Sequence, residues 1–212
     1  ITVMTAPFVI RVMISKTESA SQSSRRPFPW WGWLSVGICV IAWILAWTRF
    51  SWFRTWQPFT FSPLWFCYIL IVNALTYRRT GRCMLVDRPK VMALLFVVSA
   101  GFWWFFEYLN RFVQNWYYVN VDGLTGWQYF WYATLPFATV LPAVIGTCEY
   151  LESFPRLQAG LKRFLVIPEG LKLPLSWACL ILSCLGLMGL SAFPNLLYPL
   201  LWVSPLLIIG SI

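Results

Sequence analysis

The chain has 212 residues, of which 59% are hydrophobic and 11% are charged, and its formal net charge is +9. A soluble domain carries about 25% charged residues, so this composition excludes an ordinary soluble globule and predicts a membrane protein. Histidine is absent, which excludes His-ligated haem, His-ligated zinc and Ser-His or Cys-His nucleophile pairs.

The first part of the chain differs in composition from the rest. Residues 1–26 are expected to form a flexible polar tail, and residues 27–212 are expected to form one transmembrane helical domain. The chain begins without a methionine, and Met13 opens the polar stretch, so residues 1–12 are interpreted as a segment upstream of the native start. The last apolar run breaks off at Ile212 without a polar flank, which we interpret as truncation.

Six apolar segments approach the roughly 20 residues that a membrane-spanning helix needs. The first five cover residues 30–48, 61–77, 91–109, 127–148 and 174–192, and the sixth begins near Asn195. We therefore predict an all-α fold, a polytopic bundle of about six transmembrane helices. Pro136 and Pro142 are expected to kink the fourth helix and to open space beside Thr139.

Basic residues alternate between the linkers of these segments. The linkers after the second and fourth segments are rich in Arg and Lys: Arg78, Arg79, Arg82, Arg88, Lys90, then Arg156, Lys162, Arg163, Lys172. The opposite linkers hold only Arg49, Arg54 and Arg111. Because positive residues accumulate on the cytoplasmic side, we predict a cytoplasmic N-terminus and a bacterial inner membrane. The expected partners are membrane lipids and a membrane-protein subunit, and no nucleic acid, since no basic stripe follows a helix.

The densest polar cluster of the sequence lies at the end of the third segment. Glu107 is about 24 Å along the helix from Val91, near the non-cytoplasmic edge of a hydrocarbon core about 30 Å thick. A carboxylate at this depth is costly without a partner, and Arg111 has the spacing of an intrahelical ion pair. The candidate substrate-binding residues share or adjoin one helix face: Trp103, Trp104, Glu107, Asn110, Arg111, Gln114 and Asn115. Glu107 is the best candidate for a catalytic group, and the alternative is an interfacial ion pair in an aromatic belt.

Three further residues are secondary candidates. Asn73 is the only amide well inside an apolar run, and such residues more often bond between helices than bind substrate. Thr139 and Glu149 share one face of the fourth segment, and Glu149 is expected at the cytoplasmic end, solvated or paired with an arginine. We predict no metal site and no cofactor.

Three classes of function remain open. The first is binding or conversion of a lipophilic substrate near the non-cytoplasmic leaflet, through the Trp-Trp-Glu-Asn-Arg face. Glu107 would then serve as acid or anchor and Arg111 as an anion clamp. The second is a structural or accessory subunit of a membrane complex, and the third is a transporter or channel component, for which polar residues near the midplane are expected. The sequence does not decide whether the protein is an enzyme.

Overall fold

The computed structural model describes residues 2–14, 26–119, 121, 123–161 and 167–211, and within these ranges every regular element is a helix. The prediction of an all-α fold is confirmed. The chain forms two compact units, residues 1–101 with 126–164 (unit 1) and residues 102–125 with 165–212 (unit 2). The boundary between residues 101 and 102 falls inside one long helix.

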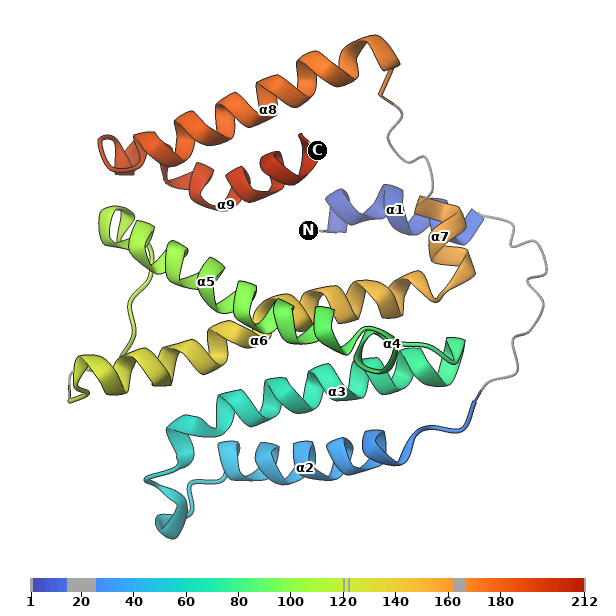
Figure 1. The fold of residues 1–212 in the computed structure, drawn as a ribbon, viewed down its shortest axis with the longest axis vertical. Coiled ribbons are helices and arrows are strands. Elements are labelled where there is room, and N and C mark those ends of the chain that lie inside the picture. The colour runs from blue at the N-terminus through green and yellow to red at the C-terminus, as the bar shows by residue number, and fades with distance from the viewer. Residues whose placement is uncertain (1, 15–25, 120, 122, 162–166, 212) are drawn as a thin grey trace. The chain divides into compact units, whose positions relative to one another are not determined.

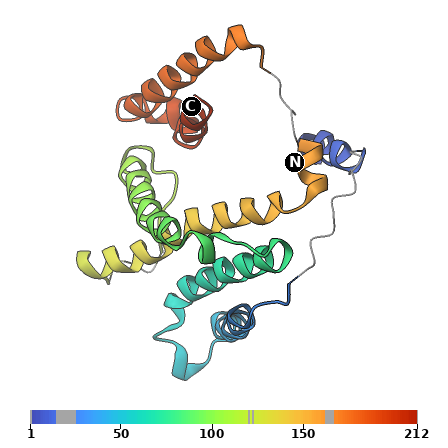
Figure 2. The ribbon, with the colours of Figure 1, turned by 45° about the vertical axis from the view of Figure 1, so that its right-hand side comes forward.

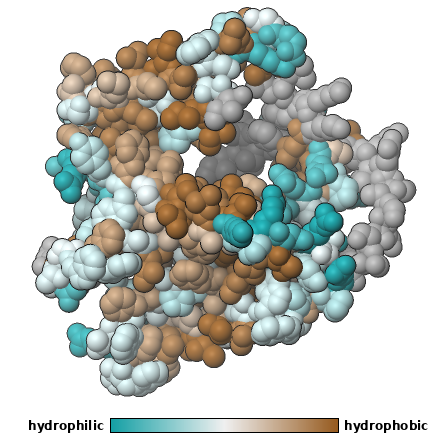
Figure 3. Space-filling view, viewed as in Figure 1, coloured by the Kyte–Doolittle hydropathy of each residue, from teal (hydrophilic) through white to brown (hydrophobic). Residues whose placement is uncertain are grey.

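Five helical spans are long and apolar enough to cross a membrane. They comprise α2 (Trp30–Trp47), α3 (Phe61–Thr80) with the preceding turn η2 (Gln57–Thr60), α5 (Pro89–Val113), α6 (Gly126–Glu152) and α8 (Glu169–Gly189). The sixth predicted segment forms α9 (Pro194–Gly210), an apolar helix of 17 residues. Figure 3 shows apolar residues along the middle of the helices and hydrophilic residues gathered toward helix ends. The chain is therefore a membrane protein.

In unit 1, α3 lies between α2 and α6 (Figures 1 and 2). Small residues mark the points of closest approach, as is common between membrane helices. A Cβ atom added to Gly32 would lie 2.7 Å from the Cβ of Ala74, so α2 and α3 pack too closely there for any larger residue. On the other side of α3, Gly146 of α6 faces Asn73, whose amide nitrogen would be 3.4 Å from an added Cβ.

Local sequence sets the ends of these helices. Pro29 precedes α2 and Pro89 is the first residue of α5, where the missing N–H has no intrahelical partner to lose. Helix α3 ends at Gly81, which has a φ of 75° and whose N–H donates to the Tyr77 carbonyl at 2.7 Å. This left-handed position favours glycine because an L side chain would be strained there. Arg26 covers the same helix end, donating its N–H to the Arg78 carbonyl at 3.0 Å.

The core of unit 1 joins α3, α6, the first part of α5 and the short helix α4 (Met84–Asp87). Its buried residues come from all four helices: Ile69, Met84, Met92 and Ala143. Phe66 and Phe96 stack next to this core with ring centroids 5.4 Å apart. Helix α4, which was not predicted, thus anchors the basic linker to the bundle.

In unit 2, α8 and α9 form a hairpin that packs on the last part of α5 (Figure 2). Ser183 of α8 and Ser204 of α9 hydrogen-bond to each other. Each hydroxyl donates to the other residue's backbone carbonyl, at 3.1 and 3.4 Å. Gly186 and Gly189 lie against Leu200 and Leu197 without room for a Cβ. The buried core consists of two α5 residues and two from the hairpin: Phe106, Leu109, Leu190 and Leu201.

Three other helices were not predicted. The 3-10 turn η1 (Ser51–Phe53) lies between α2 and α3, and α1 (Thr2–Ile14) packs against α7 (Pro155–Leu161) within unit 1. A Cβ added to Gly160 would meet the backbone of Val12 at 2.7 Å. The predicted flexible tail falls partly on residues 15–25, which lie outside the described residues, so the division into tail and membrane domain stays a prediction.

Candidate functional site

The end of α5 is shaped by Asn110. The helix stops at Val113, and Gln114 follows with a φ of 47°, a left-handed conformation that non-glycine residues seldom adopt. The side chain of Asn110 holds the chain after this turn. Its carbonyl oxygen accepts the N–H groups of Asn115 and Trp116 at 2.9 and 3.3 Å, and its amide donates to the Trp116 carbonyl at 2.7 Å. The segment 114–118 is thereby folded back along the helix.

Glu107 lies one turn before Asn110 and binds the same returning segment. Its Oε1 accepts the indole N–H of Trp116 at 2.9 Å and the hydroxyl of Tyr118 at 2.6 Å. Both donors are neutral, so they orient the carboxylate without neutralising it. The side chain of Glu107 is half-buried, and the two aromatic residues partly cover it.

A series of contacting aromatic rings connects the Glu107 carboxylate with the hairpin of α8 and α9. The ring of Trp116 lies 5.4 Å from that of Trp202 on α9, and Trp202 lies 5.7 Å from Phe106. Trp103 stacks on Phe106 at 6.1 Å. We use the name Glu107 cluster for the group formed by Glu107, Asn110, Trp116, Tyr118 and Trp202, all of which belong to unit 2.

The hypothesis of an ion pair between Glu107 and Arg111 is wrong. The ion pairs among the described residues join Arg88 to Glu149 and Lys172 to Glu169, and the Arg111 side chain is exposed. Spacing on a helix brings two side chains within reach of each other but does not exclude other partners. Here the chain after Gln114 returns with two donors, and Glu107 turns toward them.

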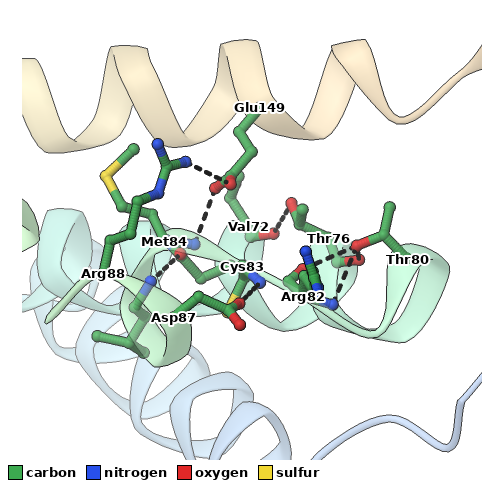
Figure 4. Close-up of polar contacts among 11 residues, drawn as sticks. Val72, Thr76, Thr80, Arg82, Cys83, Met84, Asp87, Arg88 and Glu149 are labelled. Carbon is green, nitrogen blue, oxygen red and sulfur yellow. Dashed lines mark hydrogen bonds and ion pairs between the residues drawn. The ribbon is translucent and has the colours of Figure 1, made fainter.

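A second polar cluster surrounds the start of α4 (Figure 4). The N–H groups of the N-cap residue Cys83 and of the first two helical residues, Met84 and Leu85, each meet a side-chain oxygen. The N–H of Cys83 donates to Asp87 at 2.7 Å, that of Met84 to Glu149 at 3.0 Å, and that of Leu85 to Asn73 at 3.0 Å. The N–H groups at the start of a helix have no acceptor within the helix, so these side-chain oxygens act as their acceptors.

Glu149 also binds Arg88, whose guanidinium lies 3.2 Å from the other carboxylate oxygen. Figure 4 shows Glu149 reaching from α6 toward Met84 and Arg88. Asn73 is fully buried, and its amide donates to the Ile69 carbonyl at 2.9 Å. Two of the secondary candidates thus meet at α4, and their contacts tie α3 and α6 to it.

Cys83 lies inside this second cluster. Burial raises the pKa of its thiol, and the neighbouring Glu149 and Asp87 carboxylates raise it further, against the backbone N–H groups of Val86 and Leu85 that lower it. A protonated thiol is a poor nucleophile and a poor metal ligand. Cys83 therefore fills space in the cluster.

The space predicted beside Thr139 stays a prediction, and the described contacts there are hydrogen bonds. Thr139 is 1% exposed, and its hydroxyl donates to the Pro136 carbonyl at 2.6 Å. Ser99 of α5 inserts its hydroxyl into the backbone of α6, donating to the Phe137 carbonyl at 2.5 Å and accepting the Leu141 N–H at 3.0 Å. Two hydroxyls thus bind backbone groups of α6 in the segment that begins at Pro136 and ends before Pro142.

The structure brings together only part of the predicted substrate-binding face. Glu107, Asn110 and Asn115 share one hydrogen-bond network, while Trp103 and Trp104 are half-buried and Arg111 and Gln114 are exposed. Sequence reasoning missed Trp116, Tyr118 and Trp202. The dense aromatic composition after Gln114 was a signal for the first two, whereas Trp202 lies in an otherwise apolar helix with no local signal.

Among the residues that the structure describes, no three Cys, Asp or Glu side chains are grouped so as to hold a metal ion. Compared with known proteins, the chain matches no protein-family model, no curated protein and no solved structure.

Proposed function

We propose that this membrane protein binds a lipophilic ligand at the Glu107 cluster, with Glu107 as the polar anchor. The observation that carries the proposal is the orientation of the Glu107 carboxylate by Trp116 and Tyr118 at 2.9 and 2.6 Å. A carboxylate near the end of a transmembrane helix is costly, and such groups commonly mark a ligand or ion site. The neighbouring aromatic rings offer apolar contact area for a hydrocarbon chain.

The proposed ligand binds to the Glu107 cluster, and Arg111 is not proposed as an anion clamp. Arg111 is exposed and forms no ion pair with Glu107, so the two do not form one polar site. Tyr118 and Trp202 are 40% and 44% exposed, so a ligand approaching from the lipid side can reach both rings. The ligand would lie against unit 2 at the end of α5.

Saturable labelling with a photoactivatable lipid analogue tests this proposal. The purified protein in lipid nanodiscs is treated with an uncharged dodecyl diazirine alcohol, and labelled peptides are quantified as the probe concentration rises. We expect label in residues 102–118 to saturate and to be displaced by unlabelled dodecanol. Helix α2 is an internal control because Trp30 and Trp47 are 76% and 73% exposed, so its label should rise linearly.

A matched pair of variants sharpens the test. Trp116→Phe removes the indole N–H that orients Glu107 and should weaken saturable labelling, whereas Trp47→Phe at the end of α2 should leave it unchanged. If the label in residues 102–118 rises in parallel with that in α2, the cluster is ordinary lipid-facing surface and the proposal is wrong.

The accessory-subunit function is the second candidate. Every buried side-chain nitrogen and oxygen of the described residues has a hydrogen-bond partner within the chain. The side chains of Asn73, Thr139 and Glu149 thus form hydrogen bonds within the protein, as expected of a structural protein. Non-saturable labelling at the Glu107 cluster is the result that this second function predicts.

A further inference from the structure

We infer that the ligand of the Glu107 cluster carries a positively charged ammonium head group. This inference rests on the proposed function, since it names the class of ligand that the same site takes. Glu107 brings a negative charge to the end of a transmembrane helix, and no basic side chain among the described residues pairs with it. The two donors that hold it, Trp116 and Tyr118, are both neutral.

The basic residue nearest to Glu107 in the sequence is Arg111. Arg111 stands four residues from Glu107, the spacing at which an intrahelical ion pair forms readily, yet the two are not paired. Both donors bind the same oxygen, Oε1, which leaves Oε2 for another partner. A cation delivered by the ligand would complete the site.

The side chains near Glu107 include aromatic rings, whose faces attract cations. Trp116 and Trp202 lie 5.4 Å apart and are tilted by 48°, and Phe106 adjoins Trp202 at 5.7 Å. Aromatic faces are electron-rich, and tryptophan in particular attracts alkylammonium groups that lie within about 6 Å of its ring. Aromatic rings beside a carboxylate are the combination that recognises ammonium head groups, whereas an anionic head group would be repelled by Glu107.

The location suits a head group attached to a chain. Glu107 lies six residues before the end of α5 at Val113, which corresponds to about 9 Å along a helix. This depth is close to the boundary between hydrocarbon and polar head groups. An ammonium at the carboxylate would therefore leave an attached acyl chain free to extend along the apolar helices of unit 2.

Competition between dodecyl compounds that differ only in head group tests the inference. Dodecyltrimethylammonium and dodecyl sulfate, below their micellar concentrations, and dodecanol, below its solubility limit, compete with the photoactivatable dodecyl probe for residues 102–118. We expect the ammonium compound to displace the probe at about tenfold lower concentration than dodecanol, with the sulfate weakest. Tetramethylammonium alone forms a further arm, and displacement by it at the same concentration would point to a free cation in place of a lipid head group.

Glu107→Gln removes the charge while its amide oxygen can still accept from Trp116 and Tyr118. In this variant we expect the ammonium compound and dodecanol to displace the probe at similar concentrations, so that the preference for the ammonium compound is lost. Glu152→Gln, at the exposed end of α6, is the matched control and should keep the preference. Equal potency of the three compounds on the native protein, or a preference that survives in Glu107→Gln, would overturn the inference. Non-saturable labelling by the uncharged probe would overturn the proposed function itself.

Discussion

Glu149 is the residue on which three elements of unit 1 meet. Its carboxylate accepts the Met84 N–H at 3.0 Å and binds Arg88 at 3.2 Å, so α6, α4 and the end of the basic linker are held at one point. The two contacts differ in environment, because the backbone N–H is part-buried whereas the Arg88 side chain is 57% exposed. Glu149 should therefore stabilise the fold mainly through the backbone hydrogen bond.

Replacement of each partner by alanine separates these two contacts. Glu149→Ala leaves the Met84 N–H without its acceptor and should lower the free energy of unfolding by about 1–3 kcal/mol. Arg88→Ala should cost less than about 1 kcal/mol, because an exposed ion pair is screened by solvent and salt. Denaturant unfolding in detergent micelles measures both values, and a larger loss for Arg88→Ala would contradict this assignment.

At the scale of elements, α6 shows how a membrane helix continues past two prolines. Pro136 and Pro142 lie inside a helix of 27 residues, each without an N–H to donate. The hydroxyls of Thr139 and Ser99 bind the carbonyls of Pro136 and Phe137, and Ser99 also accepts the Leu141 N–H. Because lipid offers no hydrogen bonds, side chains from within the protein must satisfy these groups.

The Ser99 bridge makes a prediction for α6. Ser99→Ala should leave the Phe137 carbonyl and the Leu141 N–H without the bridging hydroxyl and lower stability by about 1–3 kcal/mol. Amide hydrogen exchange should rise locally around Leu141. Ser191→Ala is a suitable control, since Ser191 is exposed and follows α8, and it should change neither quantity. Unchanged exchange at Leu141 in Ser99→Ala would show that the helix closes without the bridge.

At the scale of the whole molecule, the orientation in the membrane remains a prediction from charge. Residues 78–90 hold five basic residues and one acidic residue, and four of the basic residues are exposed: Arg78, Arg82, Arg88 and Lys90. The structure adds that α4 and its cluster lie in this linker, so the predicted cytoplasmic side would also carry the Glu149 contacts.

Cysteine labelling in intact cells tests this orientation. On a background without the native cysteines, a cysteine in place of Arg82 should resist a membrane-impermeant thiol reagent, because its linker is predicted to be cytoplasmic. A cysteine in place of Gly123, in the linker between α5 and α6, should react. Labelling after cell lysis controls for accessibility at both positions, and the reverse pattern in intact cells would place the N-terminus outside.

The sequence alone determined that this is an all-α membrane protein and where its apolar helices lie. Those properties depend on composition and on the length of apolar runs, which are local and additive along the chain. Gly81 and Pro89 mark helix ends in the same local way. The prediction that polar residues gather around Glu107 was also local, because neighbours on a helix are set by the helical repeat.

Only the tertiary structure decided which partners these residues choose. Glu107 binds Trp116 and Tyr118 in place of Arg111, because the chain reverses after Gln114. Trp202 contacts Trp116, which lies 86 residues before it in the sequence, because the α8 and α9 hairpin packs on α5. Ser99 of α5 binds the backbone of α6 between its two prolines. Such contacts depend on how helices pack against one another, and no pattern within a single helix specifies them.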